Sequence, residues 1–332
     1  MSAKGVLLAI ATLFASLGTA CADEYPAHRI TVIAPFPAGS SPDTVTRIVT
    51  KKMAELLKQE LIVMNVPGAL GMVGVLELLK APPNGYVICL CNDGPLLTVM
   101  ADKLARDKTP PYYPEDFTPI GQAVEVYYAI IAHKDLPVGD FAELAQYVRA
   151  HPGELNFASA SPTSEIITGL EKYLFGQDAF VEVKYHGSEP KAVLDLLSGR
   201  VHVMAATSFT ALPLIETGSV KVLGTIGKTR SPYVPNVPTL EEQTPQFREF
   251  HALIAELKPW NSLVGPRGLP EPIVKKLTAT LKEALGDPEV IDGLTKARLG
   301  IRYGDDAELG RLFQRLPILT DVLRRAGTKL LD

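Results

Sequence analysis

The sequence contains a segment whose residue types and spacing suit the binding of an anion. In residues 35–43 (PFPAGSSPD), Ser41 suits the N-cap of a helix, Pro42 its first position and Asp43 its first turn. Gly39 allows the backbone to turn tightly and to come close to a ligand. Because the first amides of a helix lack partners inside the helix, this segment predicts a site for a carboxylate or a phosphate.

The second half of the chain has two similar helix starts. One is residues 161–164 (SPTS), and the other is residues 185–188 (YHGS), where Ser188 suits a helix cap. In open α/β sheets, ligands bind beyond the carboxyl ends of the strands, so two facing lobes would gather these loops around one cleft. Any one of these starts is also what an ordinary helix cap looks like. The residues alone therefore leave anion binding and plain capping as open alternatives.

The elements that must position these loops alternate along the chain. Periodicity predicts strands at 29–36, 61–66 and 86–91 and helices at 43–59 and 68–80, a β-α-β-α-β order typical of a mostly parallel sheet. The pattern then restarts, with strands predicted at 126–133, 155–160, 180–185, 201–206 and 220–226 and helices at 140–150, 165–175 and 189–197. A proline-rich connection at 231–238 leads to a mainly helical remainder, at 272–285, 288–298 and 306–326.

Length and composition support two folded domains. A chain of 332 residues exceeds what one core usually holds, and 46% hydrophobic with 21% charged residues is ordinary for a folded soluble protein. The formal net charge of −4 does not favour a nucleic-acid surface, which needs a basic face. We expect no nucleic-acid partner, and a monomer is the default for this architecture.

The N-terminus is typical of a secretory signal peptide. Lys4 precedes an apolar run at 5–18, and Ala20-Cys21-Ala22 gives a small-x-small cleavage site. We predict that residues 1–22 are removed, that the mature chain begins at Asp23, and that the protein is exported to the periplasm. Lipoprotein processing at Cys21 is the less favoured alternative, because the residues before it fit a lipobox poorly.

The sequence gives little support for a metal site, a serine hydrolase or a dinucleotide-binding site. Cys89 and Cys91 are expected to be small buried groups, and no spacing of cysteines or histidines suggests a metal site. The chain has no G-x-S-x-G elbow, and the glycine spacing at 68–74 does not fit a dinucleotide fingerprint, so no cofactor is predicted. Trp260 is expected to pack under the cleft edge rather than stack on a ligand. His186 is the one histidine expected to help hold a carboxylate, as a cationic imidazole.

In order along nearly the whole mature chain, the sequence resembles the Bug, or TctC-like, extracytoplasmic binding proteins of tripartite tricarboxylate transport systems. The segments that carry the resemblance are residues 25–30, 35–43, 65–74 (NVPGALGMVG), 83–86 (PNGY), 113–117, 155–160 (LNFASA), 185–188, 195–199 (DLLSG) and 235–239 (PNVPT).

The resemblance implies a type II-like periplasmic-binding-protein fold, with two α/β lobes, a hinge and a central cleft for a small carboxylate. It assigns residues 23–125 with 230–332 to lobe 1 and residues 126–229 to lobe 2, with hinge strands near 123–126 and 225–229. Carried over by position, the ligand-binding residues are Phe36, Ala38, Gly39, Ser40, Ser41, Asp43 and Asn92 in lobe 1, and Ser161, Thr163, Ser164, Tyr185, His186, Gly187 and Ser188 in lobe 2.

The sequence departs from the family pattern at both loops. The family's double glycine is Gly39-Ser40, its Ser-Thr is Ser41-Pro42, and two acids of a later motif are replaced by His202 and Ala206. The expected function is capture of a small organic anion for a membrane transporter or sensor, not catalysis. Two alternatives stay open: a secreted α/β enzyme acting on a carboxylic ester or amide, and a diverged paralogue used for sensing. Replacing Ser161 or Ser164 with alanine is expected to weaken binding without unfolding the protein.

Overall fold

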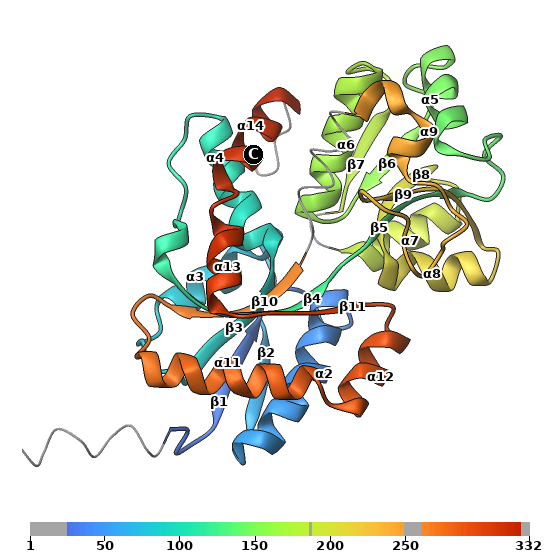
Figure 1. Ribbon diagram of the computed structural model, residues 1–332. Helices are drawn as coiled ribbons and strands as arrows, with labels where there is room; N and C mark the ends of the chain where they lie inside the picture. Colours follow the sequence, from blue (N-terminus) through green and yellow to red (C-terminus); the bar gives the residue numbers. More distant parts are fainter. Residues whose placement is uncertain (1–24, 186–187, 249–259, 327–332) are drawn as a thin grey trace, which may run out of the picture.

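The chain folds around two separate sheets, each covered by helices, as the computed structural model of residues 25–185, 188–248 and 260–326 shows (Figure 1). The first sheet has the strand order β11-β4-β10-β3-β1-β2. Its strands β1 to β3 run parallel, whereas β10, β4 and β11 pair antiparallel. The bounds are β1 (Ile30–Ala34), β2 (Leu61–Asn65), β3 (Val87–Asn92), β4 (Phe117–Glu125), β10 (Trp260–Pro266) and β11 (Gly300–Gly304).

Helices cover the first sheet because each has one apolar stripe. In α2 (Ser41–Leu57), Val45, Val49 and Met53 recur at helical spacing and are fully buried. The helices α11 (Glu271–Leu285) and α12 (Pro288–Lys296) pack against α2, as Figure 1 shows. The remaining helices of this lobe are α3 (Met72–Leu79), α4 (Val99–Ala105), α13 (Asp306–Phe313) and α14 (Leu316–Ala326), with short helical turns at Ala69–Gly71, Gly94–Thr98 and Pro114–Asp116.

The second lobe is built on a sheet of order β7-β6-β8-β5-β9, in which β6 runs parallel to β7 and β8, and β5 antiparallel to β8 and β9. Its strands are β5 (Tyr128–His133), β6 (Asn156–Ser159), β7 (Val181–Lys184), β8 (Val203–Thr207) and β9 (Val220–Ile226). Its helices are α5 (Phe141–Ala150), α6 (Pro162–Phe175), α7 (Glu189–Leu197), α8 (Ser208–Glu216) and α9 (Leu240–Gln243), and a helical turn spans Pro245–Phe247.

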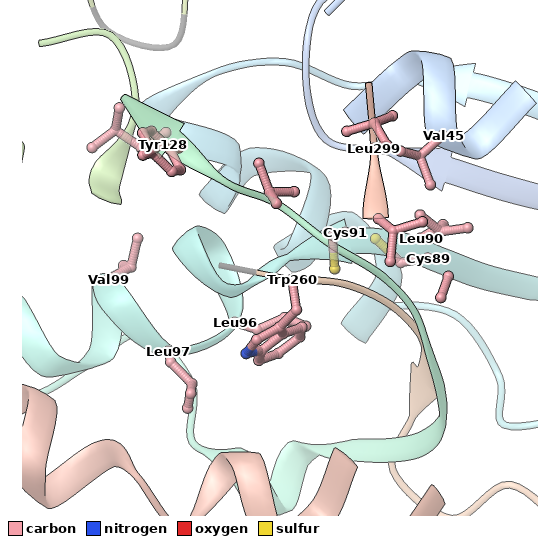
Figure 2. Close-up of a cluster of buried hydrophobic side chains, with 14 of the residues drawn as sticks. Val45, Cys89, Leu90, Cys91, Leu96, Leu97, Val99, Tyr128, Trp260 and Leu299 are labelled. Atoms are coloured by element: carbon pink, nitrogen blue, oxygen red, sulfur yellow. The ribbon is translucent and has the colours of Figure 1, made fainter. Parts of the chain in front are cut away.

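The predicted roles of Trp260 and the two cysteines as core residues are confirmed. Trp260 is 1% exposed, and Figure 2 shows its indole beside Leu96 in the apolar cluster of the first lobe. Cys89 and Cys91 are fully buried free thiols on β3. These side chains lie near the carboxyl end of β3 and the start of β10, where Asn92 and Asn261 pair and line a cavity between the lobes.

The border between the lobes differs from the expected one. The chain enters the second lobe between Glu125 and Tyr128, close to the predicted crossing. The segment assigned to lobe 1 from residue 230 instead begins on the second sheet: Thr239 bridges to Thr225, and Gln243 donates its side-chain amide to the carbonyl of Leu223 at 2.9 Å. The expected hinge at 225–229 is therefore wrong, because the chain still contacts the second sheet at Thr239 and Gln243.

The three antiparallel strands of the first sheet were not predicted. β4 contains Pro119 and Gly121, and β10 combines polar residues with Gly265 and Pro266, so neither has the composition of a strand. Both form because long-range pairing satisfies their backbone groups within the sheet. They matter for function because β10 carries a polar residue to the cleft.

The last helix joins the two lobes. α14 packs against α4 of the first lobe and against α6 of the second, and Figure 1 shows it rising beside α4. Within the described residues, no helix is long and apolar enough to span a membrane. The predicted signal peptide at residues 1–22, with Cys21, lies outside the described residues.

Candidate functional site

The start of α2 has a fixed loop conformation. Its N-cap is Ser40, in an extended conformation, rather than the expected Ser41, which is the first helical residue. Gly39 has a φ of +80°, a conformation that favours glycine, and it lets the loop turn directly before the cap. The helix therefore begins one residue earlier than predicted. The backbone amides of its first turn, which have no partner inside the helix, come directly after the loop of residues 36–40.

Asp43 holds this loop in place. Its Oδ2 accepts hydrogen bonds from the Gly39 N–H (2.9 Å) and from Arg47 Nε (3.0 Å), and its Oδ1 accepts one from Asn65 Nδ2 (2.8 Å). Burial would raise the pKa of Asp43, but these hydrogen bonds outweigh it and the pKa lies below its usual value. Asp43 is thus committed to partners within the protein, and it holds the loop in place without lining the cavity.

The first turn of α6 forms the matching loop of the second lobe. Ser161 is its N-cap and accepts a hydrogen bond from the Ser164 N–H, while Ser164 Oγ accepts one from the Ser161 N–H at 2.8 Å. Ser164 Oγ also accepts from the Ala160 N–H, so its hydroxyl is directed into the loop. Ser161 Oγ additionally lies 3.0 Å from the Tyr128 hydroxyl at the start of β5. Ser161 is therefore the serine of this pair that lies toward the cleft.

A cavity lies between these two loops. The volume that the centre of a water molecule can occupy is about 40 Å³, and all the space between the lining atoms, including the part open to solvent, is about 480 Å³. Both lobes contribute to its wall, so it is a cleft between lobes and not a surface groove on one of them. The lining residues are Phe36, Ser40, Ser41, Pro42, Asn92, Asp93, Val126, Tyr128, Ala160, Ser161, Glu189, Thr207 and Asn261.

The cavity wall includes part of the predicted set. Of the residues expected to bind a ligand, the wall contains Phe36, Ser40, Ser41, Asn92 and Ser161. The lining residues do not include the expected Ala38, Gly39, Asp43, Thr163, Ser164, Tyr185 and Ser188, all of which the structure describes. The expected His186 and Gly187 lie outside the described residues.

Tyr185 is held by a residue of α7, the helix that follows it in the chain. Its hydroxyl donates to Asp195 Oδ2 at 2.7 Å, and burial together with Asp195 raises the pKa of Tyr185 to about 12. Ser188, the predicted cap, is the N-cap of α7, and its N–H donates to the Tyr185 carbonyl at 3.0 Å. Both residues therefore shape the loop before α7, whose first residue, Glu189, is the one in the cavity wall.

Several polar residues of the wall were missed from the sequence. Asp93 directly follows β3, Tyr128 begins β5 and Thr207 ends β8, so a search for polar residues at strand ends would have found them. Glu189 is the first residue of a predicted helix. Asn261 offered no such signal, because β10 was not recognised as a strand.

Two polar side chains of the wall, Asn261 and Ser41, have no hydrogen-bond partner among the residues that the structure describes. Asn261 is 1% exposed, and neither its amide nitrogen nor its amide oxygen is hydrogen-bonded. Ser41, at the first turn of α2, is 4% exposed, and its hydroxyl also lacks a partner. Buried polar groups are nearly always paired, and an unpaired one costs about 1–3 kcal/mol. A bound ligand would satisfy both groups.

The two acids of the wall come from different lobes. Asp93 is 6% exposed, and burial raises its pKa to about 7 despite hydrogen bonds from Thr163 and the Trp260 N–H. Glu189 accepts a hydrogen bond from the Thr207 N–H at 2.8 Å, and burial of its carboxyl group raises its pKa. Burial raises the pKa of Tyr128 above its usual value, and the nearby charges of Glu189 and Asp93 raise it as well. The wall thus combines acceptors and hydroxyls on each side.

The described residues offer no metal centre. No group of three or more histidine, cysteine, aspartate or glutamate side chains in that part of the chain could hold an ion. His202 accepts a hydrogen bond from the Asn156 N–H at 2.8 Å, and its pKa is lowered by burial and by His133. His202 therefore has a structural role, as the acceptor for the Asn156 N–H.

Comparisons with known proteins agree with this architecture. The family described as the tripartite tricarboxylate transporter family receptor matches residues 45–318. The UPF0065 protein in the tcbD–tcbE intergenic region of Pseudomonas sp. strain P51 is 30% identical, over 93% of this chain and 89% of its own length. The periplasmic binding protein BugD has a structure similar to this one (TM-score 0.80, 28% identity, 92% of this chain and 99% of BugD). MatC from Rhodopseudomonas palustris, solved with bound malate, is also similar (TM-score 0.77, 29% identity, 90% of this chain and 100% of MatC).

Proposed function

This chain belongs to the tripartite tricarboxylate transporter receptor family, and from that premise we propose that it captures a small carboxylate between its two lobes for delivery to membrane transporter subunits. The fold and the position of the cavity agree with that role. MatC, a similar structure, contains malate, a small dicarboxylate. The proposal includes export to the periplasm through residues 1–22 and function as a monomer.

The observation that carries the proposal is the start of α2 at the cavity. Ser40, Ser41 and Pro42 line the wall at the N-terminus of a 17-residue helix, where the helix dipole and free amides favour a negative charge. The buried Ser41 hydroxyl adds a donor that has no partner among residues 25–185, 188–248 and 260–326. A carboxylate at this point would satisfy groups that the fold leaves unsatisfied.

Closure of the lobes would complete the site. Ser161, Tyr128 and Thr207 approach from the second lobe, so a ligand on α2 gains these contacts only when the lobes meet. A ligand shifts the open–closed equilibrium by its extra contacts in the closed state. The closed form is then the one that a transporter recognises.

Recognition rather than catalysis suits the wall. The first-lobe loop and the Ser161 loop present hydroxyls and backbone amides, and general acid–base catalysis needs titratable groups placed against a reacting bond. Asp93 and Glu189 each hold a partner within the protein, Thr163 for Asp93 and Thr207 for Glu189. Both acids are therefore interpreted as binding groups.

A thermal-shift screen of purified residues 23–332 tests the proposal. The panel contains mono-, di- and tricarboxylates, amino acids and aromatic acids, and native mass spectrometry runs beside it to detect a ligand retained through purification. A saturable rise in melting temperature with one class of carboxylate is expected. No shift with any acid, and no retained ligand, would contradict the proposal, and turnover of a carboxylic ester or amide would support an enzyme instead.

A further inference from the structure

The cavity wall has an unusual polar balance for a site that holds an anion. Two carboxyl groups, Asp93 and Glu189, line it, and among the described lining residues none is a lysine, an arginine or a histidine. The α2 amides and the Ser41 hydroxyl can hold one carboxylate. A second carboxylate in the same small cavity would lie near two acids with no cationic side chain of the described wall to compensate.

We propose that the site prefers a monocarboxylate whose second polar group is an N–H donor, such as a primary amide or an amine, over a dicarboxylate. This inference rests on the proposed function, and it names the ligand class within it. Asp93, Glu189 and Asn261 are the residues that set the preference.

Asp93 has acceptor capacity left for such a donor. Its Oδ2 accepts the Thr163 hydroxyl at 3.2 Å, and the Trp260 N–H also donates to the carboxyl group. An ionised carboxylate offers about four acceptor positions, so these bonds do not exhaust it. A ligand N–H would add a charge-assisted hydrogen bond in a water-poor site. Glu189 is a second acceptor of the same kind, since its carboxyl group accepts hydrogen bonds from the N–H and the hydroxyl of Thr207.

Asn261 matches an amide on the ligand. Its buried side chain offers both a donor and an acceptor, and both lack partners within the described part of the chain. A primary amide presents the same two groups, so it can satisfy both atoms at once, whereas a carboxylate satisfies only the donor. Asn261 pairs with Asn92 across β10 and β3, and the Trp260 N–H beside it donates to Asp93. The amide of Asn261 and the carboxyl of Asp93 thus belong to one corner of the cavity.

The charged groups on the surrounding elements do not offset these acids. Asp43 on α2 is paired with Arg47, and Glu165 on α6 is paired with Lys184 at 3.2 Å. Tyr128 on β5 is the remaining titratable group of the described wall, and burial and both acids hold it neutral. Asp93 and Glu189 therefore decide the charge of the described wall.

The preference has a pH signature that needs no variant. A ligand N–H favours the ionised form of Asp93, so binding releases a proton and affinity rises as the pH increases through about 7. A second carboxylate favours the protonated form, so its affinity falls over the same range.

The test uses calorimetry of residues 23–332 with two matched probes, succinamate and succinate, between pH 6.5 and 8.5. The amide of succinamate does not titrate in this range, so the slope reports on the protein. We expect succinamate to bind at least about tenfold more tightly than succinate at pH 8, since like charges placed together in one site lower affinity by a factor of about ten or more. Glu143→Gln is the matched control, because Glu143 lies on the far helix α5, where it accepts the Gly139 N–H.

The variants Asp93→Asn and Glu189→Gln locate the effect. Each should narrow the ratio between the two probes to below about threefold, chiefly by improving succinate, and Glu143→Gln should leave it unchanged. The inference would be overturned if the wild-type protein bound succinate as tightly as succinamate or more tightly, and if its affinity for succinate rose with pH or did not change. That result would leave the proposed function standing. Failure of every carboxylate to bind would remove both. If a variant unfolds, the wild-type pH slope alone decides.

Discussion

Thr163, in the first turn of α6, donates its hydroxyl to Oδ2 of Asp93, at the end of β3, over 3.2 Å. The two residues belong to different lobes, so this bond exists only when the lobes are together. Both side chains are buried, Thr163 at 4% exposed and Asp93 at 6%. The closed arrangement therefore has a direct tie between the two halves of the binding site.

Thr163→Val should loosen this tie. The variant keeps the shape of the side chain but loses one hydrogen bond to a carboxyl group, worth about 1 kcal/mol, so ligand affinity should fall roughly fivefold. Calorimetry with a carboxylate from the screen measures the change. Thr280→Val is the control, because the Thr280 hydroxyl donates to the Lys276 carbonyl within α11. Equal affinities in all three proteins would show that the Thr163–Asp93 bond does not contribute to closure.

The two serines of the α6 start should separate in their effects. Ser161 lines the cavity and contacts the Tyr128 hydroxyl, so Ser161→Ala should weaken binding. Ser164 Oγ is directed into the capping box, so Ser164→Ala should lower stability with little loss of affinity, whereas Ser161→Ala also removes the N-cap and should lower stability by about 1 kcal/mol as well. Calorimetry and urea unfolding on both variants provide the two readouts. A larger loss of affinity in Ser164→Ala than in Ser161→Ala would reverse this assignment.

Asp43→Asn should destabilise the loop before α2 in a pH-dependent way. The pKa of Asp43 is below its usual value, because hydrogen bonds from Arg47, Asn65 and Gly39 outweigh burial. Its stabilising effect is present above the unfolded pKa, near 4, and is lost as the pH falls through the folded value. At pH 7 the variant should lose about 1–3 kcal/mol of unfolding free energy, and the gap should narrow toward pH 3. A gap independent of pH would contradict this role.

Glu171→Gln should stabilise the protein at alkaline pH. Glu171 on α6 is 1% exposed with no hydrogen-bond partner for its carboxyl oxygens among the described residues, and burial raises its pKa well above the usual range. The folded state then binds more protons than the unfolded state, so stability falls as the pH rises above about 4.

Melting curves of the Glu171 variant and of the exposed control Glu283→Gln check this at pH 5 and pH 8. We expect Glu171→Gln to melt at least about 2 °C higher than wild type at pH 8, with a smaller difference at pH 5. A lower melting temperature at pH 8 would mean that the ionised carboxylate is stabilising.

The sequence-based predictions were correct where the structure depends on residues close together in the sequence. The parallel core of β1, β2 and β3 with α2 and α3 follows from hydrophobic periodicity, and Ser40, Ser41 and Ser161 were found because helix starts have a sequence signature. β10 was missed because its pairing with β3 and β4 is long-range, and Asn261 was missed with it. The lobe border was misplaced because Gln243 returns to the second sheet through contacts that no local pattern shows.

The most direct test of carboxylate capture compares succinamate with its neutral analogue succinamide by calorimetry on residues 23–332. The two probes differ only in the carboxylate that the start of α2 would hold. We predict saturable one-to-one binding of succinamate and at least about tenfold weaker binding of succinamide, since hydrogen bonds to a charged group contribute about 1.5–3 kcal/mol. Equal affinity for the two probes would contradict the claim that this protein holds a carboxylate at Ser40 and Ser41.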